Sequence, residues 1–401
     1  MRYKAMPALG FSAVLGLGGV LFAAPAQAAG TGTVAVGTYL EYKAASGKQN
    51  NLVVTRSGNT ITFDDSVSLK AGKGCKAASG HKTVVTCTLA NPGTVIVTLG
   101  DRNDSFVNRT SLRFNVYGGS GNDKLTGGSA IEMLDGGTGT DKLYGNGGDD
   151  TLRGRAGNDL LDAGDGNDRL EGADGNDTLV GRPGNDTIAG AAGKDVVWAG
   201  AGNDHIYDAA KSADVFHGGT GFDRVSYISR TKAIVADADG RSGDDGESGE
   251  HDTIDLDVEA LVGGSGNDRL TGNASANALD GHSGNDVLAG LGGNDLLEGF
   301  AGRDTIDGGA GDDEVYGGFD NDTLSGGDGA DLVVGGDGND QVAGGAGNDK
   351  LYGWLVPVVP DGGPPVEQDP DDDRIGGALD GGADDDLCLE GRSGTRVNCE
   401  S

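Results

Sequence analysis

The feature that most constrains the fold is a nine-residue period that runs through two long blocks of the chain. The first block spans 118–207 and the second spans 263–352, with ten consecutive frames in each. In each block the sixth position is Asp in nine of the ten frames, and the eighth is Leu, Ile or Val in all ten. A period this strict indicates repeated units that stack on their neighbours.

The residues of one frame predict how the chain is wound. The frame at 118–126 reads GGSGNDKLT. Its last three residues suit a short strand, in which the aliphatic eighth residue points to one face and its neighbours to the other. Its glycine-rich first six residues suit a tight reversal of the chain. Two nine-residue frames therefore make one coil of 18 residues, with a turn at each edge.

Composition without the period would favour disorder. Glycine accounts for 78 of 401 residues, aromatic residues for 5%, and the formal net charge is -33. Such a chain buries too little apolar surface to offset the entropy of ordering it. The period instead predicts a fold that depends on a bound cation.

Stacked coils place every second sixth-position Asp on the same edge, and like charges then lie about 4.8 Å apart. At an effective dielectric of about 20, each contact costs on the order of 3 kcal/mol. The sum exceeds the usual stability of a small domain, about 5–15 kcal/mol. We therefore predict that these residues are metal ligands: Asp123, Asp141, Asp150, Asp159, Asp168, Asp177, Asp186, Asp195, Asp204, Asp268, Asp286, Asp295, Asp304, Asp313, Asp322, Asp331, Asp340 and Asp349.

The consensus GGxGxDx(aliphatic)x resembles the RTX, or hemolysin-type, calcium-binding repeat. The resemblance implies a parallel β-roll whose stacked turns bind calcium through Asp carboxylates and backbone carbonyls. Calcium accepts six to eight oxygen ligands in flexible geometry, whereas magnesium demands a tight octahedron. Seven Asp pairs per block are 18 residues apart, so we expect about fourteen calcium ions. The alternative is that the Asp side chains only form solvated turns.

Two frames depart from the consensus and predict weak sites. In the frame at 127–135, Glu132 stands in place of the sixth-position Asp and Ala130 in place of the fourth-position glycine. In the frame at 272–280, Asn277 and Ser275 stand at the same two positions. Each is the second frame of its block.

The predicted fold is all-β: a parallel β-roll in two blocks, with a small β-rich N-terminal region and a disulfide-closed C-terminal cap. The expected segments are a signal peptide (1–28), the N-terminal region (29–117), the first roll block (118–226), an acidic β insert (227–262), the second roll block (263–352), and a Pro-rich insert with a degenerate-repeat cap (353–401).

The first residues predict export. Arg2 and Lys4 precede an apolar stretch at 9–24, and Ala-Gln-Ala at 26–28 is a small-x-small cleavage pattern. A transmembrane anchor is the alternative, but the apolar stretch is short for one. We expect a secreted, extracellular protein with no membrane span.

The N-terminal region predicts strands. Residues 51–56 and 60–63 read as a hairpin around a glycine turn, and 94–99 as a further strand. Residues 100–106 are a loose copy of the nonapeptide turn. We expect a cap that merges into the solenoid; a ligand-binding β-domain is the alternative.

The insert and the C-terminal segment leave alternatives open. Residues 225–236 read as longer strands, and 237–257 as a flexible acidic loop or an extra calcium site. The Trp354 segment either covers the last coil or binds a partner. The four cysteines predict two local disulfides, Cys75–Cys87 and Cys388–Cys399, since neither pair has zinc-finger spacing.

The function expected from these features is calcium binding. The strongly acidic chain argues against a nucleic-acid partner, because phosphate would be repelled. The HExxH and GxSxG motifs are absent from the sequence and its five histidines are scattered, so we expect no enzyme activity. We expect a structural or adhesive extracellular protein that folds on binding calcium. The alternative is a binding module that uses the N-terminal region or the Trp354 loop, with an unknown partner on the cell surface or in the matrix.

Overall fold

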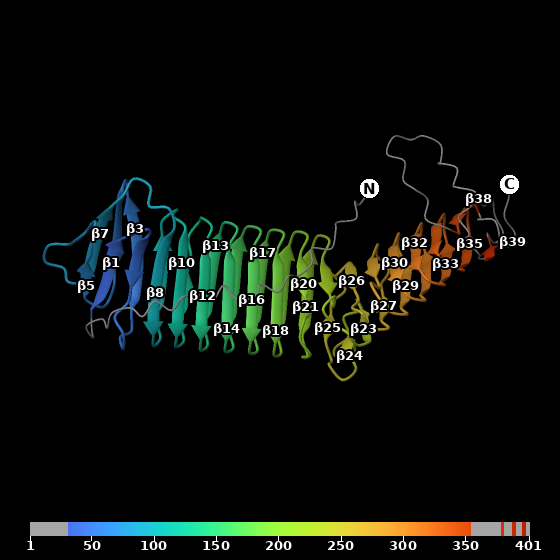
Figure 1. Ribbon diagram of the computed structural model, residues 1–401, viewed down its shortest axis with the longest axis horizontal. Helices are drawn as coiled ribbons and strands as arrows, with labels where there is room; N and C mark the ends of the chain where they lie inside the picture. Colours follow the sequence, from blue (N-terminus) through green and yellow to red (C-terminus); the bar gives the residue numbers. More distant parts are fainter. Residues whose placement is uncertain (1–30, 354–377, 381–386, 390–394, 398–401) are drawn as a thin grey trace.

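The computed structural model describes residues 31–353 and three further strands at 378–380, 387–389 and 395–397. Every regular element in these residues is a β-strand, and the chain winds into an elongated rod (Figure 1). The predicted all-β solenoid is therefore confirmed.

One face of the rod is a single sheet of 18 strands, here called the continuous sheet. Beyond the N-terminal strands its neighbours pair in parallel, coil after coil. Its strands are, in order along the rod, β5 (Leu69–Ala71), β1 (Gly32–Val36), β2 (Leu40–Lys43), β8 (Val95–Asp101), β10 (Phe114–Ser120), β12 (Met133–Thr138), β14 (Thr151–Ala156), β16 (Arg169–Asp174), β18 (Thr187–Ala192), β20 (His205–Tyr207), β22 (Arg224–Ser226), β26 (Ala260–Val262), β28 (Ala278–Asp280), β30 (Leu296–Ala301), β32 (Glu314–Phe319), β34 (Leu332–Asp337), β36 (Lys350–Tyr352) and β38 (Leu387–Leu389).

The opposite face consists of two sheets that follow one another along the rod. The first has 12 strands: β6 (Cys75–Ala77), β7 (Val84–Thr88), β4 (Thr60–Asp64), β3 (Asn51–Ser57), β9 (Ser105–Arg109), β11 (Lys124–Thr126), β13 (Lys142–Gly147), β15 (Leu160–Asp165), β17 (Thr178–Pro183), β19 (Val196–Ala201), β21 (Val215–Thr220) and β25 (Thr253–Ile254). The second has nine: β24 (Gly246–Glu247), β23 (Ile234–Asp237), β27 (Arg269–Thr271), β29 (Val287–Gly292), β31 (Thr305–Ala310), β33 (Thr323–Asp328), β35 (Gln341–Ala346), β37 (Ala378–Asp380) and β39 (Thr395–Val397).

The register confirms the 18-residue coil. Leu125 lies opposite Leu143, and Leu143 opposite Leu161, in successive coils. These eighth-position side chains are fully buried and form one core along the rod. Most repeat strands are longer than the three residues that we predicted. They have six, as in β14, because the second and third residues of the next frame also pair with the neighbouring coil.

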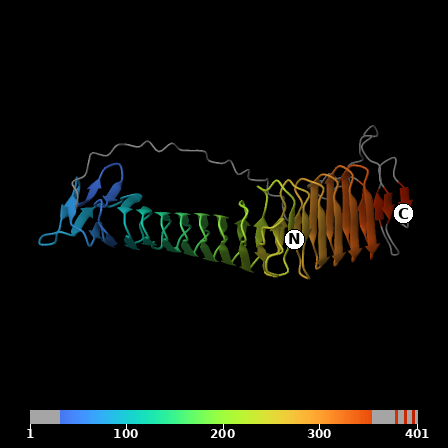
Figure 2. The ribbon, with the colours of Figure 1, turned by 90° about the horizontal axis from the view of Figure 1, so that it is seen from below.

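The insert joins the two blocks on one face and separates them on the other. Val225 of β22 pairs with Leu261 of β26, so the continuous sheet passes through the insert. On the opposite face the 12-stranded sheet ends at β25, and the nine-stranded sheet begins with β24 and β23. Figures 1 and 2 show that the strands of the second block are turned about the long axis relative to those of the first.

The prediction of longer strands over 225–236 is wrong. The structure has two short strands there, β22 and β23. The chain between them reverses, with the Arg230 amide donating to the Tyr227 carbonyl at 2.8 Å. Val225, Ile234 and Ala236 are buried in these two short strands, and Tyr227 is buried in the turn that follows β22.

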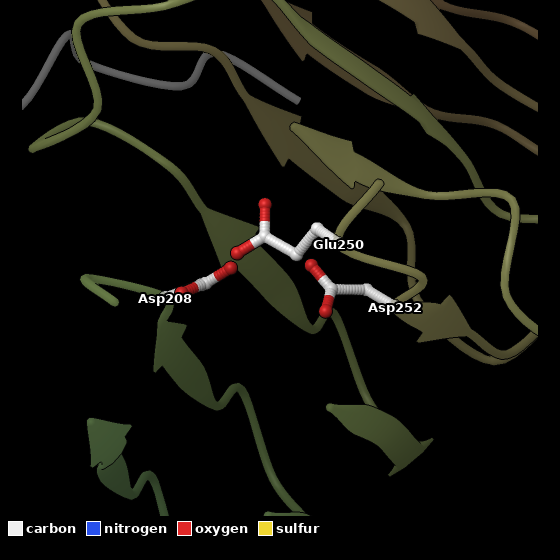
Figure 3. Close-up of side chains that lie close together, drawn as sticks. All are labelled: Asp208, Glu250 and Asp252. Atoms are coloured by element: carbon white, nitrogen blue, oxygen red, sulfur yellow. The ribbon is translucent and has the colours of Figure 1, made fainter. Parts of the chain in front are cut away.

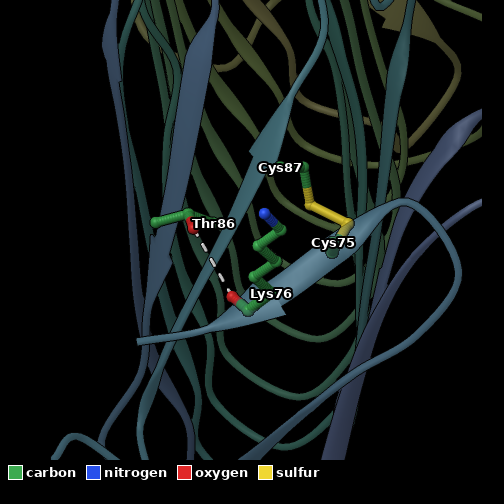
Figure 4. The surroundings of a disulfide bond; sticks show 4 residues. All are labelled: Cys75, Lys76, Thr86 and Cys87. Atoms are coloured by element: carbon green, nitrogen blue, oxygen red, sulfur yellow. Dashed lines mark hydrogen bonds between the residues drawn. A yellow bond between two sulfur atoms is a disulfide. The ribbon is translucent and has the colours of Figure 1, made fainter. Parts of the chain in front are cut away.

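The N-terminal strands continue the rod and cover its end. The predicted hairpin is present as antiparallel β3 and β4, and β3 also pairs in parallel with β9. The predicted disulfide Cys75–Cys87 joins neighbouring strands β6 and β7 at the outer edge of this region (Figure 4).

The C-terminal strands resume the coil pattern. Strands β37 and β38 pair in parallel with β35 and β36, and β39 with β37. The Cys388–Cys399 bridge of the expected cap, the Trp354 segment and the signal peptide at 1–28 lie outside the described residues.

Candidate calcium-binding columns

The eighteen predicted Asp ligands lie inside the rod, in columns at its edges. Each is 3% exposed or less. Within a column, the backbone amide of one Asp donates to Oδ1 of the Asp one coil further on. Asp123 donates to Asp141 and Asp141 to Asp159 in this way, both at 2.7 Å. The same bond recurs in the second block, where Asp268 donates to Asp286 at 2.7 Å.

In sixteen of these residues the second carboxylate oxygen is buried without a hydrogen-bond partner. Asp268 differs, because its Oδ2 accepts the Gly264 amide at 2.6 Å. The unpartnered Oδ2 atoms belong to Asp123, Asp141, Asp150, Asp159, Asp168, Asp177, Asp186, Asp195, Asp204, Asp286, Asp295, Asp304, Asp313, Asp322, Asp331 and Asp340. A buried anionic oxygen without a donor is costly unless a cation neutralises it.

The first glycine of the frame leaves room for these oxygens. A Cβ on Gly118 would lie 2.5 Å from Oδ2 of Asp123 and 2.5 Å from the carbonyl oxygen of Gly136 in the next coil. A carboxylate oxygen and a backbone carbonyl therefore converge beside the same Cα. Most other frames show the same arrangement, for example at Gly154 with Asp159 and the Gly172 carbonyl.

The electrostatic cost in the columns comes mainly from burial. Desolvation raises the pKa of Asp141 to about 7 and that of Asp150 to about 8, and repulsion from neighbouring carboxylates adds less. Repulsion between stacked charges, the cost predicted from the sequence, is therefore the smaller of the two effects. Both effects favour protonation of the carboxylate, or binding of a cation to it in place of the proton.

The donor set fits calcium. It consists of carboxylate and carbonyl oxygens, which are the ligands of a hard cation, with no nitrogen or sulfur that would favour zinc. The Asp residues of each column would hold the ions, together with the carbonyls of first-position glycines such as Gly136.

The two predicted weak frames differ from the others in their hydrogen bonds. The Glu132 carboxylate accepts from Asn108 Nδ2 and from the Gly128 amide, both at 3.1 Å, so both of its oxygens are engaged. Asn277 accepts from the Asn273 amide at 2.7 Å and carries no charge. Both still donate their amide to the next Asp of their column.

The columns are longer than the sequence predicted. Asp104 donates its amide to Asp123 at 2.7 Å, within the loose copy of the turn noticed in the N-terminal region. Asp214 and Asp223 continue two columns beyond Asp195 and Asp204. Each of these added steps is 19 residues rather than 18, which hides it from a strict nine-residue search.

The acidic insert brings further carboxylates together. Asp208, Glu250 and Asp252 form one buried group in which the ligand oxygens lie within 4.8 Å of one another (Figure 3). A more exposed group lies at Asp237, Asp239 and Asp244.

Stacked turns with inward carboxylates, wound in 18-residue coils, define a calcium-binding parallel β-roll. The profile of the RTX calcium-binding nonapeptide repeat matches residues 115–131, 135–170, 171–206, 262–297, 280–315, 290–324, 298–333 and 325–355. Both blocks of the chain therefore consist of repeats of the RTX calcium-binding nonapeptide family. No curated protein matches it. In the described part of the chain, none of the secondary structure is a helix of the length and apolarity needed to cross a bilayer.

Proposed function

We propose that this protein is a secreted, extracellular structural or adhesive rod that folds when calcium ions fill its columns, about fourteen of them between the Asp pairs of the two repeat blocks. The observation that carries the proposal is the set of buried Oδ2 atoms without partners, repeated along both blocks. A rod that needs millimolar calcium suits the extracellular medium, because extracellular calcium modules bind with dissociation constants of about 0.1–1 mM.

Two further observations support an extracellular location. The N-terminal sequence has the pattern of a cleavable export signal. The Cys75–Cys87 disulfide is of the kind that persists in oxidising compartments. A rod of stacked coils also presents long, repetitive faces, which suits a structural or adhesive role.

We propose no enzyme activity. One surface depression of about 640 Å³ is shallow and open, and it is lined by Arg56, Gly58, Asn108, Arg109, Thr110, Ser111, Gly128 and Ser129. That lining offers no carboxylate, histidine or cysteine for acid–base or nucleophilic chemistry.

The same depression favours one alternative, a binding module at the N-terminal end. Arg56 and Arg109 bring two positive charges together there, although the formal net charge of the whole chain is -33. An anionic ligand would suit it. If the alternative holds, replacing Arg56 and Arg109 by Ala in the full chain should abolish binding to the source cell surface without changing the calcium-dependent fold.

The test of the main proposal is calcium-coupled folding. Far-ultraviolet circular dichroism of the mature chain should show a largely disordered protein in chelator, which gains β signal as calcium rises. Mass spectrometry of protein from the culture medium should show cleavage after residue 28. A chelated chain with its full β signal would refute the folding mechanism, and an intact leader on protein retained in the cell would refute secretion.

A further inference from the structure

The insert completes a buried acidic group at the end of one Asp column, where Asp252 accepts the Asp214 amide. Asp208, Glu250 and Asp252 are 3%, 4% and 0% exposed, and their oxygens lie within 4.8 Å of one another. Asp208 directly follows β20 of the first block, whereas Glu250 and Asp252 lie between β24 and β25 of the insert. Figure 3 shows the Asp208 and Glu250 carboxylates turned toward each other.

Asp208 occupies a backbone position that is glycine or alanine in all the regular frames. Ala189 pairs with Tyr207, so Asp208 stands one coil beyond Gly190. At Gly190 even a Cβ would collide with the carboxylate of Asp195. Next to the insert the coil is one residue longer, since Val196 pairs with Val215. The interior of this longer coil accommodates the buried side chain of Asp208.

One oxygen of the group is without a partner. Asp208 Oδ1 accepts the Ala210 amide at 3.1 Å, but its Oδ2 is buried and accepts no hydrogen bond. Asp252 accepts the Asp214 amide at 2.9 Å and the Tyr227 hydroxyl at 3.2 Å. Glu250 accepts the amides of Ser212 and Glu247 and is paired with Arg230.

The charges around the group do not balance. Arg230, 5% exposed, lies 3.7 Å from Asp208 and 3.6 Å from Glu247, and also contacts Glu250. Three buried carboxylates pair with this one guanidinium, those of Asp208, Glu247 and Glu250, and the buried Asp252 lies beside two of them. Lys211 and Lys232 pair with Glu247 at the rim, where their side chains are exposed. The interior therefore keeps several negative charges that need a cation.

We propose that Asp208, Glu250 and Asp252 bind one calcium ion in addition to the ions held between the Asp residues of the nonapeptide frames. Asp252 continues the column of Asp195 and Asp214, whereas Asp208 and Glu250 are not column residues. The donors are all oxygens, from two segments that are far apart in the chain, and calcium tolerates such irregular geometry better than magnesium does. The ion would link the last regular coil of the first block to the insert, where one sheet ends and the next begins. This goes beyond the function proposed above, which rests on the columns alone.

The test counts ions and follows the insert in the full mature chain. Native mass spectrometry at saturating calcium should find one ion fewer in Asp208→Asn than in the unchanged protein. Hydrogen exchange should become faster over 237–257 and stay unchanged in β14 and β30. The matched control is Asp174→Asn, which removes the same charge from an exposed residue outside the columns and should change neither measurement.

The outcomes separate this site from the columns. An unchanged ion count with unchanged protection of the insert would overturn the proposal and leave Arg230 as the sole counter-ion. If Asp208→Asn unfolds the first block, as lost protection in β14 would show, Glu250→Gln becomes the deciding variant with the same expected loss of one ion. A chain that keeps its fold without calcium would refute the proposed function, whereas a change confined to the insert bears on this site alone.

Discussion

The backbone amide of Asp141 donates to Oδ1 of Asp159, one coil further along, at 2.7 Å, and Oδ2 of Asp159 has no partner. One carboxylate thus does two things at once. Its first oxygen holds adjacent coils in register, and its second presents a buried negative charge to the space between them. The bond that builds the column therefore also creates the need for a cation.

Replacing Asp159 by Ala should weaken two calcium sites, because an interior Asp is shared by the coils on either side of it. The lost hydrogen bond to a charged acceptor should also cost about 1.5–3 kcal/mol of unfolding free energy in calcium. Calorimetric titration and thermal unfolding at fixed calcium measure both effects.

The control for this variant is Asp174→Ala, since Asp174 is exposed and belongs to no column. It removes the same charge and should leave the ion count unchanged. Asp123, the first sixth-position Asp of the first repeat block, does not end its column, because Asp104 continues the column beyond it. Equal losses in Asp159→Ala and Asp174→Ala would show that total charge, rather than the column, sets calcium binding.

The nine-residue period predicted the coil and the ligand columns. It did not predict the hydrogen bonds of individual carboxylate oxygens, or the column residues and strand pairs where the 18-residue step changes. The spacing of Asp141 and Asp159 fixes their stacking, yet nothing in the sequence says which oxygen accepts the neighbouring amide. The period does not predict Asp214, because this residue follows Asp195 by 19 residues rather than 18 and its frame lacks the glycines. The pairing of Val225 with Leu261 was hidden by the long insert between them.

Replacing Asn277 by Asp should create a stronger site at the start of the second block. Asn277 already stands in the column and donates its amide to Asp295 at 2.7 Å, but it has no charge. The added carboxylate should raise the ion count at low calcium and lower the calcium concentration at the folding midpoint. Calcium titration followed by circular dichroism measures the shift.

The matched control is Asn267→Asp. Asn267 is exposed, and its Oδ1 accepts the Asn285 amide at 2.9 Å, a bond that a carboxylate can also make. This variant adds the same charge outside the column and should not shift the midpoint. A shift of the same size in both variants would contradict a specific site at Asn277.

The calcium-free chain should gain structure on acidification. Burial raises the folded-state pKa of Asp141 to about 7, of Asp150 to about 8 and of Asp168 to about 6, whereas an unfolded Asp titrates near 3.9. Between these values the folded chain binds more protons than the unfolded one. The stability that protonation of these Asp residues contributes is therefore fully present below about pH 4. It is lost as the pH rises through about 6–8.

Circular dichroism of calcium-free protein between pH 8 and 4 tests this, with size-exclusion chromatography to detect association. The calcium-loaded chain is the internal control and should show the opposite trend, because protons compete with calcium for the same carboxylates. Loss of β signal from the calcium-free chain as the pH falls from 7 to 5 would contradict this. It would show that the buried negative charges of the columns do not oppose folding.

Reducing the Cys75–Cys87 disulfide should loosen the N-terminal cap and leave the roll intact. The two cysteines are 12 residues apart, and closing a loop of this length contributes about 2–4 kcal/mol. In a solenoid each coil contacts mainly its neighbours, so the effect should fade along the rod. Hydrogen exchange at saturating calcium should become faster in β4 and β7 and stay unchanged in β30 and β32. Cys75→Ala gives the same comparison without a reductant, because buried Cys87 keeps its place in the core. Equally faster exchange in β30 would mean that the rod unfolds as one cooperative unit.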